Sequence, residues 1–100
     1  MRIIAKSRLR KYWERPGNEQ AQPHLTEWYH FCIKQSWATP QEMKNTFGHA
    51  SIVANNRVVF NVKGNTYRIV CALDYRRQAM FIKFVGTHAE YDAIDVEVVE

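Results

Sequence analysis

The stretch that decides the fold is residues 58–85, VVFNVKGNTYRIVCALDYRRQAMFIKFV. It is rich in β-branched and aromatic residues, and turn-forming residues interrupt it at Gly64-Asn65 and at Asp74–Arg77. This pattern predicts two consecutive hairpins built from the strands Val58–Val62, Tyr67–Leu73 and Ala79–Val85. An antiparallel sheet is therefore expected in the second half of the chain.

The first half of the chain has a mainly helical pattern, with short strands expected at its two ends, Met1–Ile4 and Ser51–Ala54. Helices are expected at Ala5–Glu14, Gln20–Ser36 and Thr39–Phe47. Apolar residues recur every three or four positions in the longest of them, which predicts that it packs against the sheet. Thr39 fits as the cap of the third helix, because Glu42 follows three residues later.

After the last expected strand, Thr87–Val96 fits a short capped helix, although Val96–Val99 fits an extended tail equally well. Helices that come first and strands that follow predict one α+β domain over residues 1–100. Its N-terminal helices would pack on a predominantly antiparallel sheet of four to five strands. The other face of such a sheet is expected to stay partly free, and a free face can carry a site.

The formal net charge of +4 is concentrated in two stretches. Met1–Arg15 and Arg57–Lys83 each carry six basic residues and one acidic residue, which favours a polyanionic partner. Membrane attachment is a weaker explanation, because the chain has no run of about 18 apolar residues and no signal-peptide core, so a cytoplasmic location is expected. Cys32 and Cys71 lie among apolar neighbours without metal-type spacing, and we expect buried, reduced thiols.

Strand alternation predicts a polar, largely cationic group on the free sheet face. It consists of Asn61, Lys63, Arg68 and Lys83. His88 and Tyr91 follow in the C-terminal segment and are expected to lie beside this group, which would form a pocket for a phosphodiester. The plainer interpretation is a solvated face, since most lysines and arginines simply face water.

These side chains match the requirements of RNA cleavage by the RNA's own 2′-hydroxyl group. That reaction needs a base, an acid and cations around the phosphorus atom, but no metal ion or other cofactor. His88 is a candidate acid or base, and Tyr91 would share a helical face with it. Arg68 can hold two phosphate oxygens, while Lys63 and Lys83 can stabilise the developing charge.

Other kinds of site have less support. The chain has no CxxC pair, no HExxH sequence and no Gly-rich phosphate loop. It therefore lacks the motifs that zinc peptidases and nucleotide hydrolases need. Acidic residues do crowd the C-terminus, where two of them could in principle bind magnesium. They are better explained as a solvated acidic helix end, so no metal site is predicted.

Three segments resemble the HigB-type toxins of bacterial toxin–antitoxin pairs: Phe60–Val70, Asp74-Tyr75 and Phe81–Asp92. The resemblance extends over nearly the whole chain, and its specific part is Phe60–Asp92. Within that part Gly86–Asp92, which reads GTHAEYD, is a strong signal for so short a protein. It implies a RelE-like microbial ribonuclease fold and an mRNA interferase that generally acts on the translating ribosome. It also implies a partner antitoxin, typically a HigA-like helix-turn-helix DNA-binding protein, and the free toxin is expected to be a monomer.

By position, the resemblance assigns Arg68 the role of the phosphate-binding arginine and Tyr91 that of the functional C-terminal tyrosine. Lys63 and His88 complete the expected catalytic set. Similar proteins often have an arginine or lysine just after the glycine that ends the last strand, where this chain has Thr87-His88. Whether His88 is an acid, a base or a phosphate contact therefore stays open. Further RNA contacts are predicted at Asn61, Lys83, Arg76, Arg8 and Lys11.

Two other functions remain compatible with the sequence. A non-catalytic module could bind RNA or the ribosome and block translation, with aromatic residues of the sheet stacking on bases. A relative with the same fold could instead inhibit DNA gyrase by binding it. The catalytic residues separate these possibilities, because only an endoribonuclease depends on them.

Overall fold

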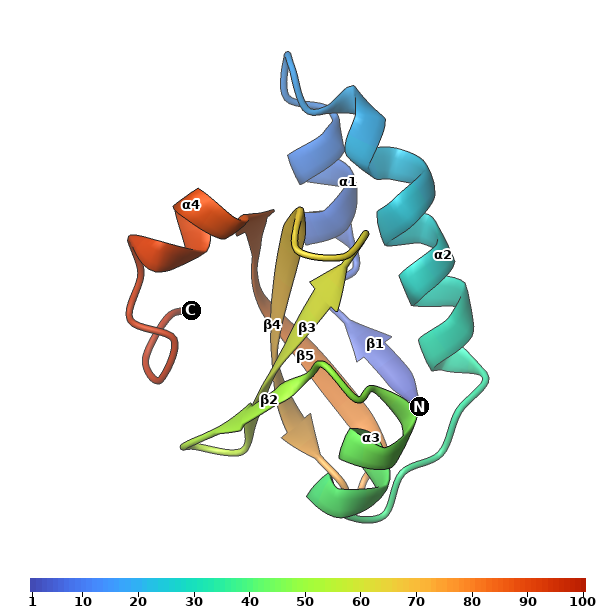
Figure 1. The fold of residues 1–100 in the computed structure, drawn as a ribbon. Helices are drawn as coiled ribbons and strands as arrows, with labels where there is room; N and C mark the ends of the chain where they lie inside the picture. Colours follow the sequence, from blue (N-terminus) through green and yellow to red (C-terminus); the bar gives the residue numbers. More distant parts are fainter.

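Five strands form one sheet in the order β1-β5-β4-β3-β2 in the computed structural model, which describes residues 1–100 (Figure 1). The strands are β1 (Arg2–Ile4), β2 (Ser51–Val53), β3 (Arg57–Val62), β4 (Tyr67–Asp74) and β5 (Ala79–Thr87). Neighbouring strands from β2 to β5 are antiparallel, whereas β1 pairs in parallel with β5 at one edge. The sheet is therefore mixed but predominantly antiparallel, which confirms the predicted α+β class.

Four α-helices accompany the sheet, and each is shorter than its sequence pattern predicts. They are α1 (Ser7–Trp13), α2 (Gln22–Ile33, preceded by the 3-10 turn η1, Glu19–Ala21), α3 (Pro40–Thr46) and α4 (His88–Asp92). The predicted cap of α3 is present, since the Thr39 hydroxyl accepts a hydrogen bond of 3.2 Å from the backbone N–H of Glu42. None of the helices is both long enough and apolar enough to span a bilayer.

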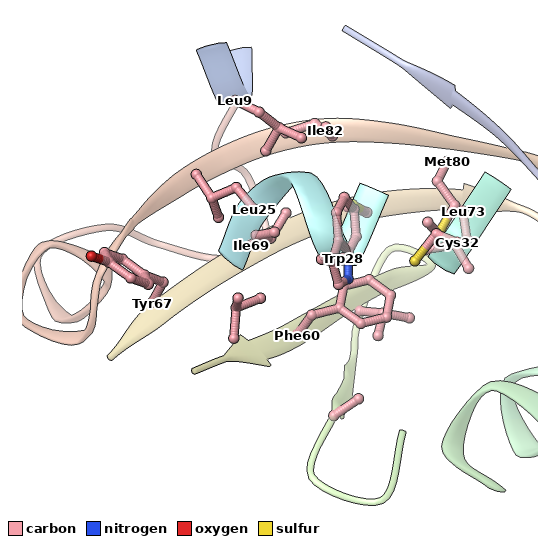
Figure 2. Close-up of a cluster of buried hydrophobic side chains, with 14 of the residues drawn as sticks. Leu9, Leu25, Trp28, Cys32, Phe60, Tyr67, Ile69, Leu73, Met80 and Ile82 are labelled. Atoms are coloured by element: carbon pink, nitrogen blue, oxygen red, sulfur yellow. The ribbon is translucent and has the colours of Figure 1, made fainter. Parts of the chain in front are cut away.

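The hydrophobic core lies between α2 and one face of the sheet (Figure 2). On β4 the core side chains are the four that strand alternation predicts, namely Tyr67, Ile69, Cys71 and Leu73. From α2 the buried side chains are Leu25, Trp28 and Cys32. Both cysteines are free and buried, as expected, and burial raises the pKa of the Cys32 thiol to about 12.

The C-terminal segment, residues 93–100, folds back onto the opposite face of the sheet instead of continuing α4. Its anchor is Arg57, which is only 7 % exposed and whose Nη1 donates hydrogen bonds to the carbonyl oxygens of Val96 (3.0 Å) and Val99. The prediction of a helix up to Val96 was therefore wrong, because the helix ends at Asp92. The alternative of an extended tail was also wrong, since turns follow α4 and the buried guanidinium binds their carbonyl groups.

A β-bulge interrupts the pairing of β4 with β5. Val70 pairs with Phe84 and Cys71 pairs with Ile82, so that Lys83 has no partner on β4. An extra residue in one strand changes the side to which the neighbouring side chains point. This irregularity affects the predicted cationic face, as described below.

Candidate active site

Arg68 lies near the start of β4, and its guanidinium group is the centre of the candidate site. It pairs with Asn61 across the β3–β4 ladder. Its Nη1 donates hydrogen bonds to Oδ1 of Asn61 and to Oδ1 of Asn65, the latter at 3.0 Å. The guanidinium carbon lies 5.7 Å from the ring centroid of Tyr91, within the range of a cation–π contact. We call these four residues the arginine site.

The positive charge of Arg68 is oriented but not neutralised. The three ion pairs of the structure involve Arg10, Arg77 and His88, and no carboxylate pairs with Arg68. The side chain is half-buried, which strengthens its interaction with an anion. Because a guanidinium group can bind two phosphate oxygens at once, the arginine site suits a phosphodiester.

Helix α4 starts at the same end of the sheet as the arginine site. Thr87 and Glu90 form a capping box, in which the Thr87 hydroxyl accepts from the Glu90 N–H at 3.2 Å and Glu90 Oε1 accepts from the Thr87 N–H at 2.8 Å. The backbone N–H of His88 donates to the carbonyl oxygen of Thr66 at 3.3 Å. These bonds fix the first turn of α4, so that Tyr91 reaches Arg68 one turn later.

His88 is the first residue of α4, and its side chain is exposed. Its Nε2 lies 3.5 Å from Oδ1 of Asp92, one helical turn further on. This contact orients the imidazole ring, whose nitrogen atoms can donate or accept a proton. The structure thus places His88 and Arg68 on adjacent elements, with no direct contact between their side chains.

Lys63 lies just outside the regular strand, so the alternation argument does not apply to this residue. β3 ends at Val62, and Lys63 begins the β3–β4 turn with a φ of +54°. This left-handed conformation ends the two-residue alternation of side chains. The Lys63 side chain instead lines a groove of about 290 Å³ beside α2, together with Asn61 and His24.

Lys83 is the unpaired residue of the bulge, so strand alternation does not determine how its side chain lies relative to Arg68. Its carbonyl oxygen accepts a hydrogen bond of 2.6 Å from Nη1 of Arg8 in α1. Lys83 thereby joins the N-terminal helix in lining a separate groove of about 400 Å³. We call it the basic groove, after its side chains Arg8, Lys11, Arg15 and Lys83.

Arg76 lies far from both cationic groups. It belongs to the turn between β4 and β5, beyond the C-terminal end of β4, whereas Arg68 is near the N-terminal end. Eight residues of extended chain correspond to roughly 26 Å. Figure 1 shows this turn at the opposite end of the sheet from α4, so Arg76 cannot contact the same phosphate as Arg68.

Three residues of the site and its supports were not predicted from sequence. Asn65 was expected only as a turn residue, and neither Glu90 nor Tyr12 was assigned to the site. In the structure the Tyr12 hydroxyl donates to Glu90 Oε1 at 3.0 Å. Two signals were available, namely the T-x-x-E spacing of a capping box at Thr87 and the need of a buried tyrosine for a hydrogen-bond partner.

Several acidic residues of the C-terminal segment have local structural partners. No three His, Cys, Asp or Glu side chains are placed so that they could hold a metal ion. Asp92 contacts His88, Asp95 accepts a hydrogen bond of 3.1 Å from the backbone N–H of Glu97, and Glu90 caps α4. Each of these carboxylates has a local structural partner.

The hydrogen bond between Tyr12 and Glu90 changes the pKa values of both groups. Burial, and then the bond to Glu90, raise the pKa of Tyr12 well above 10, so its hydroxyl remains a donor at neutral pH. Burial alone would raise the pKa of Glu90. Hydrogen bonds from Thr87 and Tyr12 outweigh that effect and hold the pKa of Glu90 below its usual 4.5.

Glu90→Gln is expected to make the free energy of unfolding less dependent on pH in the acidic range. The folded-state pKa of Glu90 lies below the unfolded value, so its contribution is complete above the unfolded pKa and disappears as the pH falls through the folded pKa. The wild type should therefore lose stability more steeply than the variant between about pH 5 and pH 3. Urea midpoints across this range measure the difference. Glu27→Gln is the control, and equal slopes in wild type and Glu90→Gln would contradict the prediction.

The fold and the arginine site together define a small basic α+β domain of the RelE-like toxin class. A family model described as HigB toxin, the RelE-like toxic component of a toxin–antitoxin system, matches residues 21–94. The chain belongs to this HigB toxin family, which makes it the toxic component of such a system and implies an antitoxin partner. The matched residues include Arg68, His88 and Tyr91, whereas Arg8 and Lys11 of the basic groove lie outside them.

The chain is also similar to the mRNA interferase HigB of Escherichia coli O6:H1. The two sequences are 26% identical over 96 residues, which cover 94% of this chain and 91% of that relative. The similarity therefore extends beyond the family match into helix α1.

Proposed function

We propose that this toxin is an endoribonuclease of the mRNA interferase type. The observation that supports the proposal is the uncompensated positive charge of Arg68. Its half-buried guanidinium group is oriented by two side-chain amides and an aromatic ring, and no carboxylate pairs with it. An uncompensated cation of this kind is suited to bind and stabilise an anionic phosphorus centre. The similarity to a relative named mRNA interferase HigB supports messenger RNA as the substrate.

The reaction begins with attack of the RNA 2′-oxygen on the neighbouring phosphorus atom. A new bond forms between the 2′-oxygen and phosphorus, the bond from phosphorus to the 5′-oxygen breaks, and the product carries a 2′,3′-cyclic phosphate. A base accepts the 2′-hydroxyl proton, and an acid gives a proton to the leaving 5′-oxygen. Atoms and charge balance without a metal ion or other cofactor.

Arg68 binds the nonbridging oxygens and stabilises the negative charge that develops on them. His88 and Tyr91, which α4 presents at the same end of the sheet, are the proton-transfer groups. Their i, i+3 spacing puts both on one side of the helix. Lys63, in the turn beside the arginine site, completes the catalytic set by contacting a neighbouring phosphate with its exposed side chain.

Additional RNA contacts come from groups around the site. Asn61 lies beside Arg68. The basic groove is connected to α4 by Tyr12, which lines the groove and donates a hydrogen bond to Glu90. Arg8, Lys11 and Lys83 bind backbone phosphates there. Arg76, at the other end of the sheet, contacts ribosomal RNA or a distant part of the message.

The proposal also includes a biological setting. The toxin acts in the cytoplasm on messages held by the ribosome, whose RNA offers phosphates to the basic groove. Its antitoxin is a HigA-like helix-turn-helix protein. The toxin is a monomer when free and part of a hetero-oligomer when neutralised.

Cleavage of isolated RNA is expected to continue in EDTA, because the nucleophile is the RNA's own hydroxyl group. The experiment uses purified toxin at high concentration with a short RNA and no ribosome, so that the ribosome's requirement for magnesium does not interfere. End-group analysis should find a 2′,3′-cyclic phosphate or a 3′-phosphate on one product and a 5′-hydroxyl on the other. A 3′-hydroxyl together with a 5′-phosphate would rule out this chemistry, and an RNA with 2′-deoxyribose at the cleavage position is the uncleavable control.

A further inference from the structure

Tyr12 and Glu90 form a hydrogen bond between two elements at opposite ends of the chain. The donor belongs to α1 and the acceptor to α4, 78 residues later, and the oxygen atoms are 3.0 Å apart. Tyr12 is only 2 % exposed, and its ring packs edge-on against Tyr67 of β4 at a centroid distance of 6.3 Å. The hydroxyl group is therefore carried by a rigid part of the core.

Glu90 is fixed by contacts on both sides. Its Oε1 accepts from the Thr87 backbone N–H at 2.8 Å and from the Tyr12 hydroxyl, while its own N–H donates to the Thr87 side chain at 3.2 Å. Glu90 thus connects the first turn of α4 to the core. Tyr91, the next residue, is the one whose ring faces Arg68.

Helix α4 depends on such an anchor. It contains five residues, none of them buried, whereas an isolated helix shorter than about 12 residues is marginal in water. Its N-terminal cap and the bond from the His88 N–H to Thr66 hold only the first turn. The bond from Tyr12 is the side-chain hydrogen bond that ties α4 to another helix.

We infer that Tyr12 is a positioning residue for the cleavage reaction, acting through Glu90 to hold α4, and with it Tyr91 and His88, against the arginine site. This inference rests on the proposed function. Catalytic groups must be held close to their productive geometry, and a displacement of about 1 Å can cost up to about 10²-fold in rate. Release of α4 should therefore lower kcat more than it weakens RNA binding.

The test compares four variants with the wild type in cleavage of isolated RNA. Tyr12→Phe keeps the ring but removes the donor, and Glu90→Ala removes the acceptor. Both are expected to lower kcat about 10-fold with KM changed less than twofold. Glu90→Gln keeps an acceptor oxygen and should retain kcat within about threefold. Tyr75→Phe is the control, because this half-buried tyrosine lies in the turn at the far end of the sheet and its hydroxyl makes no hydrogen bond.

Amide hydrogen exchange gives a second readout that does not depend on activity. The N–H groups of Ala93 and Ile94 donate to the carbonyl oxygens of Glu90 and Tyr91, at 3.2 Å each, and report the integrity of α4. In Tyr12→Phe they should exchange about 10-fold faster, while the core strands keep their protection. Tyr75→Phe should leave both regions unchanged.

Several outcomes would overturn the inference. Unchanged kcat in Tyr12→Phe would do so, whether or not exchange in α4 increased. A rise in KM alone would also do so, because it would make Tyr12 an RNA contact of the basic groove. If the wild type failed to cleave RNA, the proposed function would fail instead. The exchange of Ala93 and Ile94 would then decide by itself whether Tyr12 holds α4 in place.

Discussion

Arg68→Ala is expected to lower the rate of RNA cleavage by roughly 10²- to 10³-fold, the usual effect of removing one preorganised group that stabilises transition-state charge. The group lost is the only charge of the arginine site, and neither Asn61, Asn65 nor Tyr91 can replace it. The free energy of unfolding should change by less than about 1 kcal/mol, because Arg68 lies at the partly exposed end of β4 and takes part in no ion pair. Single-turnover cleavage of a short RNA, together with urea unfolding, measures both quantities.

Two variants sharpen this experiment. Arg76→Ala removes the same charge from the far turn and should alter cleavage of a short RNA less than about threefold, so it controls for general loss of positive charge. Arg68→Lys keeps the charge but cannot bind two phosphate oxygens in a bidentate manner, so we expect a cleavage rate between those of the wild type and Arg68→Ala. An Arg68→Ala protein that arrests growth as strongly as the wild type would favour the non-catalytic module or the gyrase-binding relative over the proposed endoribonuclease.

The fold was largely predictable because its signals are local. Turn residues at Gly64-Asn65 and Asp74–Arg77 separate β-rich segments, and the alternation in β4 correctly identified the core residues. The parallel pairing of β1 with β5 was not predictable, since it joins residues far apart in sequence and no turn specifies it. Arg57 had no local signal either, because its partners are backbone carbonyl groups of the C-terminal segment.

The candidate site was predictable only where the strands are regular. Arg68 and Asn61 pair as alternation requires, and the capping spacing after Gly86 placed the start of α4 correctly. The same rule does not extend to Lys63 and Lys83, because Lys63 has a left-handed backbone and Lys83 is the unpaired residue of a bulge. Such irregularities depend on the partner strand, which a single segment of sequence does not reveal.

The aromatic residues of the sheet were ambiguous from sequence, since they suit either a core or a surface that stacks on bases. Phe60 belongs to the core, because it is fully buried between α2 and the segment after α3. Its ring centroid lies 5.3 Å from that of Trp28 and 5.0 Å from that of Phe47, both in edge-to-face geometry. A residue in this position cannot stack on RNA without unfolding the domain.

Phe60→Ala is therefore expected to destabilise the protein by about 3–5 kcal/mol, the typical loss when a buried phenylalanine leaves a cavity. This is a large part of the roughly 5–15 kcal/mol that stabilises a domain of this size, and the thermal midpoint should fall by more than about 10 °C. Urea and thermal unfolding measure the effect. Phe81→Ala, which truncates a phenylalanine that is 36 % exposed, is the matched control and should cost less than half as much.

The same variant separates a packing role from an RNA-binding role. If Phe60 only packs the core, cleavage per folded molecule at low temperature should stay within about threefold of the wild type, because the partner contacts of Arg68 come from polar side chains and Tyr91. If instead Phe60→Ala kept its stability and lost affinity for RNA, the stacking surface of a non-catalytic module would be the better account. The buried position of Phe60 makes the first result the expected one, since a side chain must reach solvent before it can bind a base.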